Sequence, residues 1–305
     1  MEKFEINILG CGSAVPTIRH GTSAQLVNIH EKLFLVDCGE GTQTQIWKSG
    51  IRVTNMNHIF ISHAHGDHFF GLVPFVSSLT LMLNRSDDLH LWVPFDLEEP
   101  LRHDFQHYCQ LSFKLIIHPF DTSRKTLLYE DKEMKVETIP LSHGIPCCGF
   151  LFCEKPKLPV LLPDKCRAYG IPQRELGKIK NGAGWMMEDG TVIPNSELTT
   201  PSDFMPRRYA YCSDTAYNPQ MIPQIEGVNL LYHEATFISA DEMLAVKYAH
   251  STAAQAATIA RDANVEKLAI GHYSLRYNDE KPLLAEAKKI FPNTEACQEG
   301  MTISL

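Results

Sequence analysis

Short β-prone runs recur along the chain, and several of them end at a residue that can bind a metal ion. The runs, each with the residue that follows it, are 58–62 before His63, 136–142 before His143, 209–213 before Asp214, 229–232 before His233 and Glu234, and 267–271 before His272. A single strand-end histidine more often serves as a hydrogen-bonding residue than as a ligand, but the repetition favours a shared site. Open sheets flanked by helices place their sites at strand ends, so we expect these side chains to meet.

Two predicted helices contain or adjoin further histidines, and we expect these histidines to have different roles. An alanine-rich run predicts a helix, and Ser251 or Thr252 can cap its N-terminus. His250 then lies just before the helix begins. His103 and His107 are four residues apart and predict one face of another helix, but no third metal donor lies nearby in the sequence. We therefore expect that pair to lie on a solvated helix surface.

The composition is that of an ordinary globular protein. The 305 residues allow one large domain or two smaller ones, and 44% of them are hydrophobic. No apolar run is long enough to span a bilayer, and the chain starts with a strand-like run at 5–9 rather than a signal peptide. We expect a soluble protein of the cytoplasm that has no membrane partner.

Nine cysteines are spread along the chain without the paired spacing of a zinc ribbon or a disulfide framework. Reduced and mostly buried thiols are the simplest interpretation. Cys147, Cys148 and Cys153 follow His143 closely, which raises metal binding as an alternative. Cys148 and Cys153 lie at the two ends of an apolar strand-like run. We therefore favour core packing for these cysteines.

The charge of the chain is unevenly distributed. The net charge is −8, which argues against a protein covered with phosphate-binding surface. In the segment 154–180, however, seven basic side chains and three acidic ones give a local net charge of +4. A basic segment on an acidic body is a candidate binding surface for a polyanion.

The turn at 63–68 places three imidazoles and one carboxylate within six residues. A catalytic zinc usually takes three protein ligands and keeps one position open for water, so four donors in one turn indicate a second ion close by. The expected ligands are His63, His65 and His143 for one ion, Asp67, His68 and His272 for the other, and Asp214 as a bridge through its two oxygens. The donor types favour zinc, with manganese tolerable at the carboxylate-rich position. Two such ions lower the pKa of a shared water, and the resulting hydroxide can attack phosphorus in line.

Two polar residues near these runs remain after the ligands are counted. A histidine that is oriented by a carboxylate, as His250 would be by Glu234, suits a general acid that protonates a leaving oxygen. The alternative is that the two residues orient the metal ligands, and the sequence favours neither. Asp67 is expected to bind the second ion as a ligand of the catalytic site, and not to act as a free base.

The HxHxDH turn with its downstream histidines and aspartate resembles the metallo-β-lactamase superfamily. The segments 233–236 (HEAT) and 250–252 (HST) are similar to those of ribonuclease Z, the family of tRNA 3′-processing endonucleases. Further matches are 10–16 (GCGSAVP), 37–43 (DCGEGTQ) and 274–277 (SLRY). The resemblance spans nearly the whole chain and matches the short form of these enzymes.

The resemblance implies a fold, an assembly and a substrate. The implied fold is an αββα sandwich, a single domain over 1–305, with a tRNA-binding arm inserted at 154–200. The implied assembly is a homodimer with two zinc ions per subunit, in which each arm binds the tRNA held by the partner. The substrate-binding residues that we infer are Arg276 and, within the arm, Arg174, Lys178 and Lys180. One departure is the loop at 16–21, PTIRHG, which lacks the lysine common in the family.

The leading hypothesis is an endoribonuclease that cleaves the 3′ trailer from precursor tRNA. Hydroxide activated by two zinc ions would attack the phosphorus and leave a tRNA with a 3′-hydroxyl. An alternative is a small-molecule phosphodiesterase or other hydrolase of the same superfamily, because the metal chemistry is shared. A third possibility is a catalytically silent tRNA-binding protein, which ranks last because every expected ligand is present.

Overall fold

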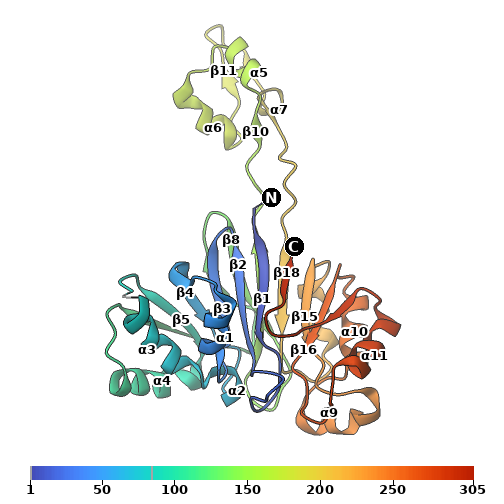
Figure 1. The fold of residues 1–305 in the computed structure, drawn as a ribbon. Helices are drawn as coiled ribbons and strands as arrows, with labels where there is room; N and C mark the ends of the chain where they lie inside the picture. Colours follow the sequence, from blue (N-terminus) through green and yellow to red (C-terminus); the bar gives the residue numbers. More distant parts are fainter. Residues whose placement is uncertain (1, 84) are drawn as a thin grey trace. The chain divides into compact units, whose positions relative to one another are not determined.

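Two seven-stranded sheets form the centre of the larger of two compact units (Figure 1). The structure is a computed structural model that describes residues 2–83 and 85–305. The first sheet has the order β18 (Thr302–Ser304), β1 (Phe4–Gly10), β2 (Ala24–Ile29), β3 (Lys32–Val36), β4 (Met56–Phe60), β5 (Leu89–Pro94) and β6 (Leu115–Phe120). The second has the order β17 (Thr294–Ala296), β16 (Leu268–Gly271), β15 (Leu230–Glu234), β14 (Arg208–Cys212), β9 (Cys148–Glu154), β8 (Met134–Pro140) and β7 (Leu127–Glu130).

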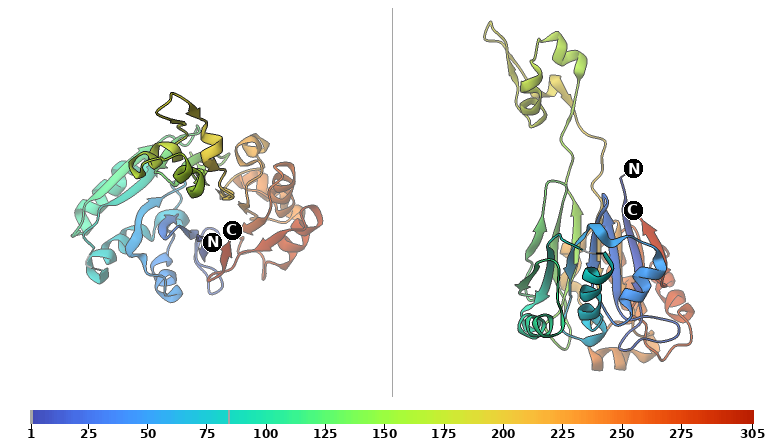
Figure 2. Two further views of the ribbon diagram at one scale, coloured as in Figure 1. Left: turned by 90° about the horizontal axis from the view of Figure 1, so that it is seen from above. Right: turned by 60° about the vertical axis from the view of Figure 1, so that its left-hand side comes forward.

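Helices cover the outer face of each sheet. The helices that follow strands of the first sheet are α1 (Thr42–Ser49), α2 (Gly66–Phe69), α3 (Leu72–Leu83) and α4 (Phe95–Tyr108). Those that follow strands of the second are α8 (Ile222–Ile225), α9 (Glu242–Tyr248), α10 (Ala253–Asp262) and α11 (Lys281–Ile290). Figure 2 shows the two sets on opposite sides of the paired sheets. The predicted αββα order is confirmed. Among the described residues, no helix has the length and apolar character needed to cross a bilayer.

Aromatic side chains fill the space between the two sheets. The ring centroids of Phe60 and Phe150 are 5.5 Å apart, and those of Phe34 and Phe152 are 5.8 Å apart. All seven residues of β9 are buried, as expected for a strand that is covered on both faces. The two sheets are therefore joined by a largely aromatic core.

Helix α10, which begins shortly after His250, starts where the sequence predicts. Thr252 is the N-cap of α10, and its side chain accepts a hydrogen bond from the backbone N–H of Gln255. The Gln255 side chain accepts in return from the backbone N–H of Thr252, at 2.9 Å. This reciprocal capping box fixes the start of the helix and, with it, the backbone beside His250.

The smaller unit comprises 154–206 and the turn at 131–134. Its elements are β10 (Val160–Leu161) paired with β13 (Thr199–Thr200), β11 (Trp185–Met186) paired with β12 (Val192–Ile193), α5 (Pro163–Ala168), α6 (Leu176–Lys180) and α7 (Asn195–Leu198). Its small core consists of Cys166, Ile171, Ile179, Ile193 and Leu198. Within this unit Lys155 donates to the backbone oxygen of Asp131, and Lys157 lies over the ring of Phe204.

Candidate metal centre

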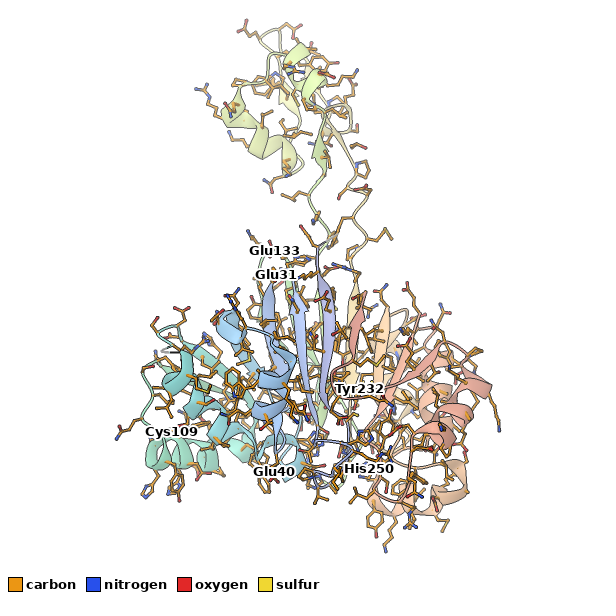
Figure 3. The ribbon with its side chains drawn as sticks, viewed as in Figure 1. Glu31, Glu40, Cys109, Glu133, Tyr232 and His250 are labelled. Carbon is orange, nitrogen blue, oxygen red and sulfur yellow. The ribbon has the colours of Figure 1, made fainter. Side chains whose placement is uncertain are left out.

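The donors predicted at strand ends gather at one end of the paired sheets. They include His63 after β4, His143 after β8, Asp214 after β14 and His272 after β16. His250, predicted to lie just before a helix, precedes α10 at the same end (Figure 3). In Figure 3 His250 lies at this end, below Tyr232 in the second sheet. The gathering follows from the topology, because β14, β15 and β16 are parallel and so end at the same edge.

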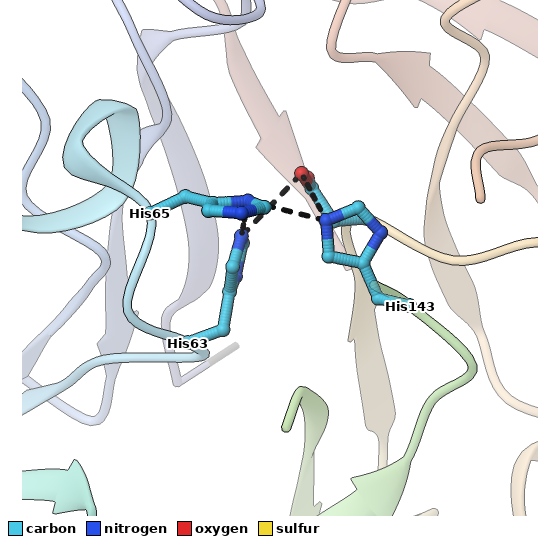
Figure 4. Close-up of side chains that lie close together, drawn as sticks. His63, His65 and His143 are labelled. Atoms are coloured by element: carbon cyan, nitrogen blue, oxygen red, sulfur yellow. Dashed lines mark hydrogen bonds and ion pairs between the residues drawn. The ribbon is translucent and has the colours of Figure 1, made fainter. Parts of the chain in front are cut away.

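The first group of donors is His63, His65, His143 and Asp214, whose ligand atoms all lie within 4.8 Å of one another. Figure 4 shows the three imidazoles pointing toward one another. Nδ1 of His65 lies 3.1 Å from Nε2 of His63 and 3.2 Å from Nε2 of His143. Burial, together with the nearby charge of His68, lowers the pKa of His63 to about 4. A neutral imidazole offers its lone pair to a metal, so this group suits zinc.

The second group of donors is Asp67, His68 and His272. Nε2 of His68 lies 3.2 Å from Oδ1 of Asp214, and Nε2 of His272 lies 3.1 Å from the same oxygen. The other oxygen of Asp214, Oδ2, faces the first group and lies 3.5 Å from Nε2 of His63. One carboxylate thus presents a different oxygen to each group, which is the arrangement expected of a bridging ligand.

In His68 and His143 the hydrogen bond is made by Nδ1 and Nε2 is left for a metal, whereas His65 faces its group with Nδ1. Nδ1 of His68 donates to Asp37 at 2.7 Å, and Nδ1 of His143 donates to the backbone oxygen of Ala249 at 2.8 Å. Nε2 of His68 and Nε2 of His272 are buried and make no hydrogen bond with the described residues. Buried ring nitrogens rarely go without a partner, so these two atoms fit metal ligands.

Asp37 is a supporting residue to which sequence reasoning assigned no role. Its buried carboxylate accepts hydrogen bonds from the hydroxyls of Ser62 and Tyr211, at 2.9 and 2.7 Å, as well as from His68. Ser62 lies 3.0 Å from Nδ1 of His63. One carboxylate therefore orients a ligand in each group. The only local signal was its place in the matched segment 37–43.

The backbone is in the left-handed region at three of these positions. The φ angles are 56° at Asp37, 23° at Asp214 and 60° at His272. Such angles cost about 1–3 kcal/mol at residues other than glycine and are concentrated at functional sites. Asp37 and His272 lie directly after a strand and Asp214 lies two residues after one, so the turn out of the strand aims each side chain across the strand ends.

Glu234 and His250 form a buried pair beside the second group. Oε1 of Glu234 accepts from Nδ1 of His250 at 2.8 Å, and Oε2 accepts from the Thr236 hydroxyl at 2.6 Å. That hydroxyl lies 3.0 Å from Nδ1 of His272, so Glu234 also orients a ligand. Burial alone would lower the pKa of His250, but the charge of Glu234 and its hydrogen bond raise that pKa to about 9. The pair thus has the geometry that each of its two predicted roles requires.

Asp67 lies among the second group rather than apart from it. Its Oδ2 is 3.5 Å from Nε2 of His272 and accepts a hydrogen bond from the backbone N–H of Ala14 at 2.7 Å. Burial would raise the pKa of Asp67, but the close contact with His272 and the charge of His68 outweigh burial and lower it. An ionised carboxylate in this position fits a metal ligand.

Both groups line one cavity of about 640 Å³, a volume within the usual range for ligand sites. His65, Asp67, His143, Asp214, His250 and His272 all line it. Arg276 is not among the lining residues, although it lies four residues after His272. Arg174, Lys178 and Lys180 are exposed residues of the smaller unit, where Lys178 pairs with Glu175 at 2.8 Å.

The residues expected to stay outside the site do so. His103 and His107 are exposed on α4, and their ring centroids are 5.3 Å apart. Cys147, Cys148 and Cys153 are buried thiols, and no described group of potential metal ligands includes them.

A second cluster, Cys11, His20 and Glu299, was not foreseen from sequence. Nδ1 of His20 lies 2.9 Å from Glu299, and Nε2 lies 2.6 Å from Glu280, which also pairs with Arg19. Both ring nitrogens of His20 therefore have carboxylate hydrogen-bond partners, whereas Nε2 of His68 and Nε2 of His272 make no hydrogen bond with the described residues. We interpret this cluster as an ionic network that holds the loop from 12 to 21.

We expect His20→Ala to destabilise the fold by about 1–3 kcal/mol, because two mostly buried carboxylates lose their shared partner. Burial would lower the pKa of His20, but Glu299 and Glu280 raise it. The stabilisation by His20 is therefore complete below about pH 6.5, and it declines as the pH rises through the pKa that His20 has in the folded protein. Urea denaturation at several pH values measures this, with the exposed His103→Ala as control. Equal stability of the wild type and His20→Ala at pH 6 would contradict the interpretation.

Proteins of known name match this chain over its whole length. The chain is 51% identical to the ribonuclease Z of Bacteroides fragilis and 46% identical to that of Porphyromonas gingivalis, and each alignment covers 100% of both chains. The crystal structure of human tRNase Z, short form, has a TM-score of 0.72 at 24% identity and 98% coverage of both chains. The metallo-β-lactamase fold protein YhfI from Bacillus subtilis has a TM-score of 0.71 at 16% identity, with both chains fully covered.

A family described as anti-Pycsar protein Apyc1 also matches, over residues 4–148. That segment carries β4, β8 and the donors from His63 to His143 but not Asp214, Glu234, His250 or His272. The full-length relatives cover all of these positions. On this full-length identity, and with the metallo-β-lactamase fold in place, the chain belongs to the ribonuclease Z family.

Proposed function

We propose that this protein removes the 3′ trailer from precursor tRNA with two zinc ions held by the two donor groups. The endoribonuclease activity agrees with the full-length relatives, which are named ribonuclease Z. The observation that carries the two-ion proposal is the carboxylate of Asp214, whose two oxygens face different groups. Nitrogen and oxygen donors in these numbers suit zinc, and manganese is the second choice.

The ligands proposed for the ions are those predicted from sequence. His63, His65 and His143 would hold one ion, Asp67, His68 and His272 the other, and Asp214 would bridge them. Two such ions supply Lewis acidity that activates an attacking water and stabilises the negative charge on the phosphate. The protein residues around them fix the ligand orientations and line the cavity.

We propose that His250 protonates the oxygen that departs from the phosphorus. Glu234 accepts from its Nδ1, which leaves Nε2 to donate a proton to the 3′ oxygen of the tRNA. Proton transfer at that atom would release a tRNA with a 3′-hydroxyl and a trailer with a 5′-phosphate. Glu234 would hold the ring in place and keep it in its protonated form.

The smaller unit is proposed to bind the tRNA away from the scissile bond. Arg174, Lys178 and Lys180 lie on η2 (Gln173–Glu175) and on α6, and all three are exposed. The short enzymes that the sequence resembles are homodimers in which this arm binds the partner's tRNA, and we propose the same assembly, in the cytoplasm. Size-exclusion chromatography with light scattering tests the dimer.

The activity is tested with a precursor tRNA that carries a 3′ trailer. We expect one cut that leaves a 3′-hydroxyl and a 5′-phosphate, and loss of the cut after zinc chelation. End-labelling and sequencing of the two products identify the bond and its chemistry. Cleavage of a small chromogenic phosphodiester without any cut in the precursor would instead favour the small-molecule alternative.

We expect reversal of three arm charges, in Arg174→Glu/Lys178→Glu/Lys180→Glu, to weaken precursor binding about tenfold or more at moderate salt. Each lost phosphate contact also lowers the slope of log affinity against log salt by about one. Filter binding over a salt series measures both quantities. A matched variant, Arg261→Glu/Lys288→Glu/Lys289→Glu, reverses exposed charges on α10 and α11 and should bind as the wild type. Equal losses in the two variants would remove the arm from the proposal.

A further inference from the structure

Two exposed aromatic side chains line the cavity of the metal centre and have no part in holding metal or moving protons. Phe70, which follows α2, is 66% exposed, and Tyr248, the last residue of α9, is 52% exposed. Both line the same cavity as His65, His143 and His250. Large aromatic side chains normally bury most of their surface, so their exposure beside a reaction site calls for a ligand.

The ring of Phe70 is held in a defined place beside the metal ligands. It packs directly on Gly66, where an added Cβ would lie 2.2 Å from Cε2 of the ring. Its edge meets the ring of Phe69 at a centroid distance of 5.0 Å. Gly66 lies between His65 and Asp67, so the turn that carries the ligands also positions the ring.

The backbone at Tyr248 is coupled to the first donor group. The next residue, Ala249, has a φ of 53° and accepts the hydrogen bond from Nδ1 of His143. The ammonium of Lys247 lies over one face of the Tyr248 ring, 5.0 Å from its centroid. The Tyr248 ring is 52% exposed, so it keeps surface on which a flat group can stack.

The charge of the cavity limits how it can recognise RNA. Among the described residues that line it, none is a lysine or an arginine, whereas Glu40, Asp67 and Asp214 are acidic. The cavity therefore offers no side-chain cation to the phosphates next to the scissile one. Stacking on aromatic rings is the other general way to bind single-stranded RNA, and it tolerates any base because every base has a π-face.

We propose that Phe70 and Tyr248 each stack on one of the two nucleobases that flank the scissile phosphodiester. This inference rests on the proposed function, because it takes RNA as the substrate. The two rings belong to segments that follow strands of different sheets, α2 after β4 and α9 after β15, and both line the cavity of the donor groups, so a phosphate between two stacked bases would lie in that cavity. The residues bind substrate and position it for the reaction.

Single substitutions test the two rings. We expect Phe70→Ala and Tyr248→Ala each to lower kcat/KM on a precursor tRNA about tenfold, mainly through KM, with zinc content unchanged. Tyr248→Phe keeps the ring and should behave as the wild type. Phe95→Ala removes another ring that is 60% exposed, on α4 outside the cavity, and should also have no effect.

A precursor with an abasic ribose on one side of the cleavage site makes the test specific. If a ring stacks on that base, its alanine variant cleaves the abasic precursor as fast as the wild-type enzyme does. Unchanged alanine penalties on both abasic precursors would overturn the proposal, as would alanine variants no slower than Phe95→Ala. Loss of the dimer in Phe70→Ala would assign that ring to a subunit contact. If the wild type fails to cut the precursor, the proposed function fails instead.

Discussion

Asp214→Ala is expected to lose bound metal and to lower kcat/KM on precursor tRNA by at least about a thousandfold. Loss of a residue that merely supports a ligand typically costs about 10–100-fold, and Asp214 is proposed to serve both ions directly. Its side chain is 2% exposed, and its oxygens lie 3.1 to 3.7 Å from Nε2 of four histidines. Without the shared negative charge, two dications would repel each other across neutral imidazoles.

Metal analysis by mass spectrometry and a cleavage time course measure the two effects. Circular dichroism checks that the variant is folded, and Asp104→Ala on the exposed face of α4 is the matched control. Asp214→Asn is informative because it keeps the shape but removes the charge, and it should also lose metal. A folded Asp214→Ala protein that retains two ions per chain would refute the bridging assignment.

His250→Ala is expected to slow turnover on precursor tRNA by about 10²–10⁴-fold while both ions stay bound. That range is typical for loss of a general acid. His250 is suited to the role because Glu234 fixes its Nδ1 and raises its pKa to about 9, so that the ring is protonated at neutral pH. Metal content and single-turnover rates, with His107→Ala as the exposed-histidine control, measure the effect.

The leaving group separates the two roles that Glu234 and His250 can have. A nitrophenyl phosphodiester releases a weak base that needs no proton, so loss of a general acid should slow its cleavage far less than that of the precursor. Equal losses on the two substrates would show instead that His250 orients the ligands. Reduced zinc content would lead to the same conclusion, because His250 also lies within 4.8 Å of ligand atoms of Asp214 and His272.

The runs of apolar residues were sufficient to predict most of the strands that position the site. β4, β8, β14, β15 and β16 lie where the sequence predicted them, because alternation and β-branched composition are local properties. Their donors were recognisable for the same reason, since His63, His143, Asp214 and His272 each lie within three residues of the end of a strand, and Glu234 is the last residue of β15. Thr252 was recognisable as a cap because capping depends on a few neighbouring residues.

Contacts across long stretches of sequence could not be predicted in this way. Asp37 accepts a hydrogen bond from His68, which lies 31 residues later in the sequence, and another from the hydroxyl of Tyr211, which lies 174 residues later. His20 meets Glu280 and Glu299 across more than 250 residues. No periodicity links such positions, so their pairing depends on how the two sheets pack.

The sequence by itself determined the chemistry, because donor types and their spacing within 63–68 are properties of the chain. It also indicated a candidate polyanion-binding segment, since charge is additive along a sequence. The sequence also predicted the division of the donors and the bridging place of Asp214, but only the tertiary structure showed Oδ2 of Asp214 at 3.5 Å from His63 and Oδ1 at 3.2 Å from His68. The physical reason is topological. Parallel strands of one sheet end at a common edge, and the second sheet packs against the first. Residues that are far apart in the sequence come within a few ångströms of one another only after the two sheets have packed.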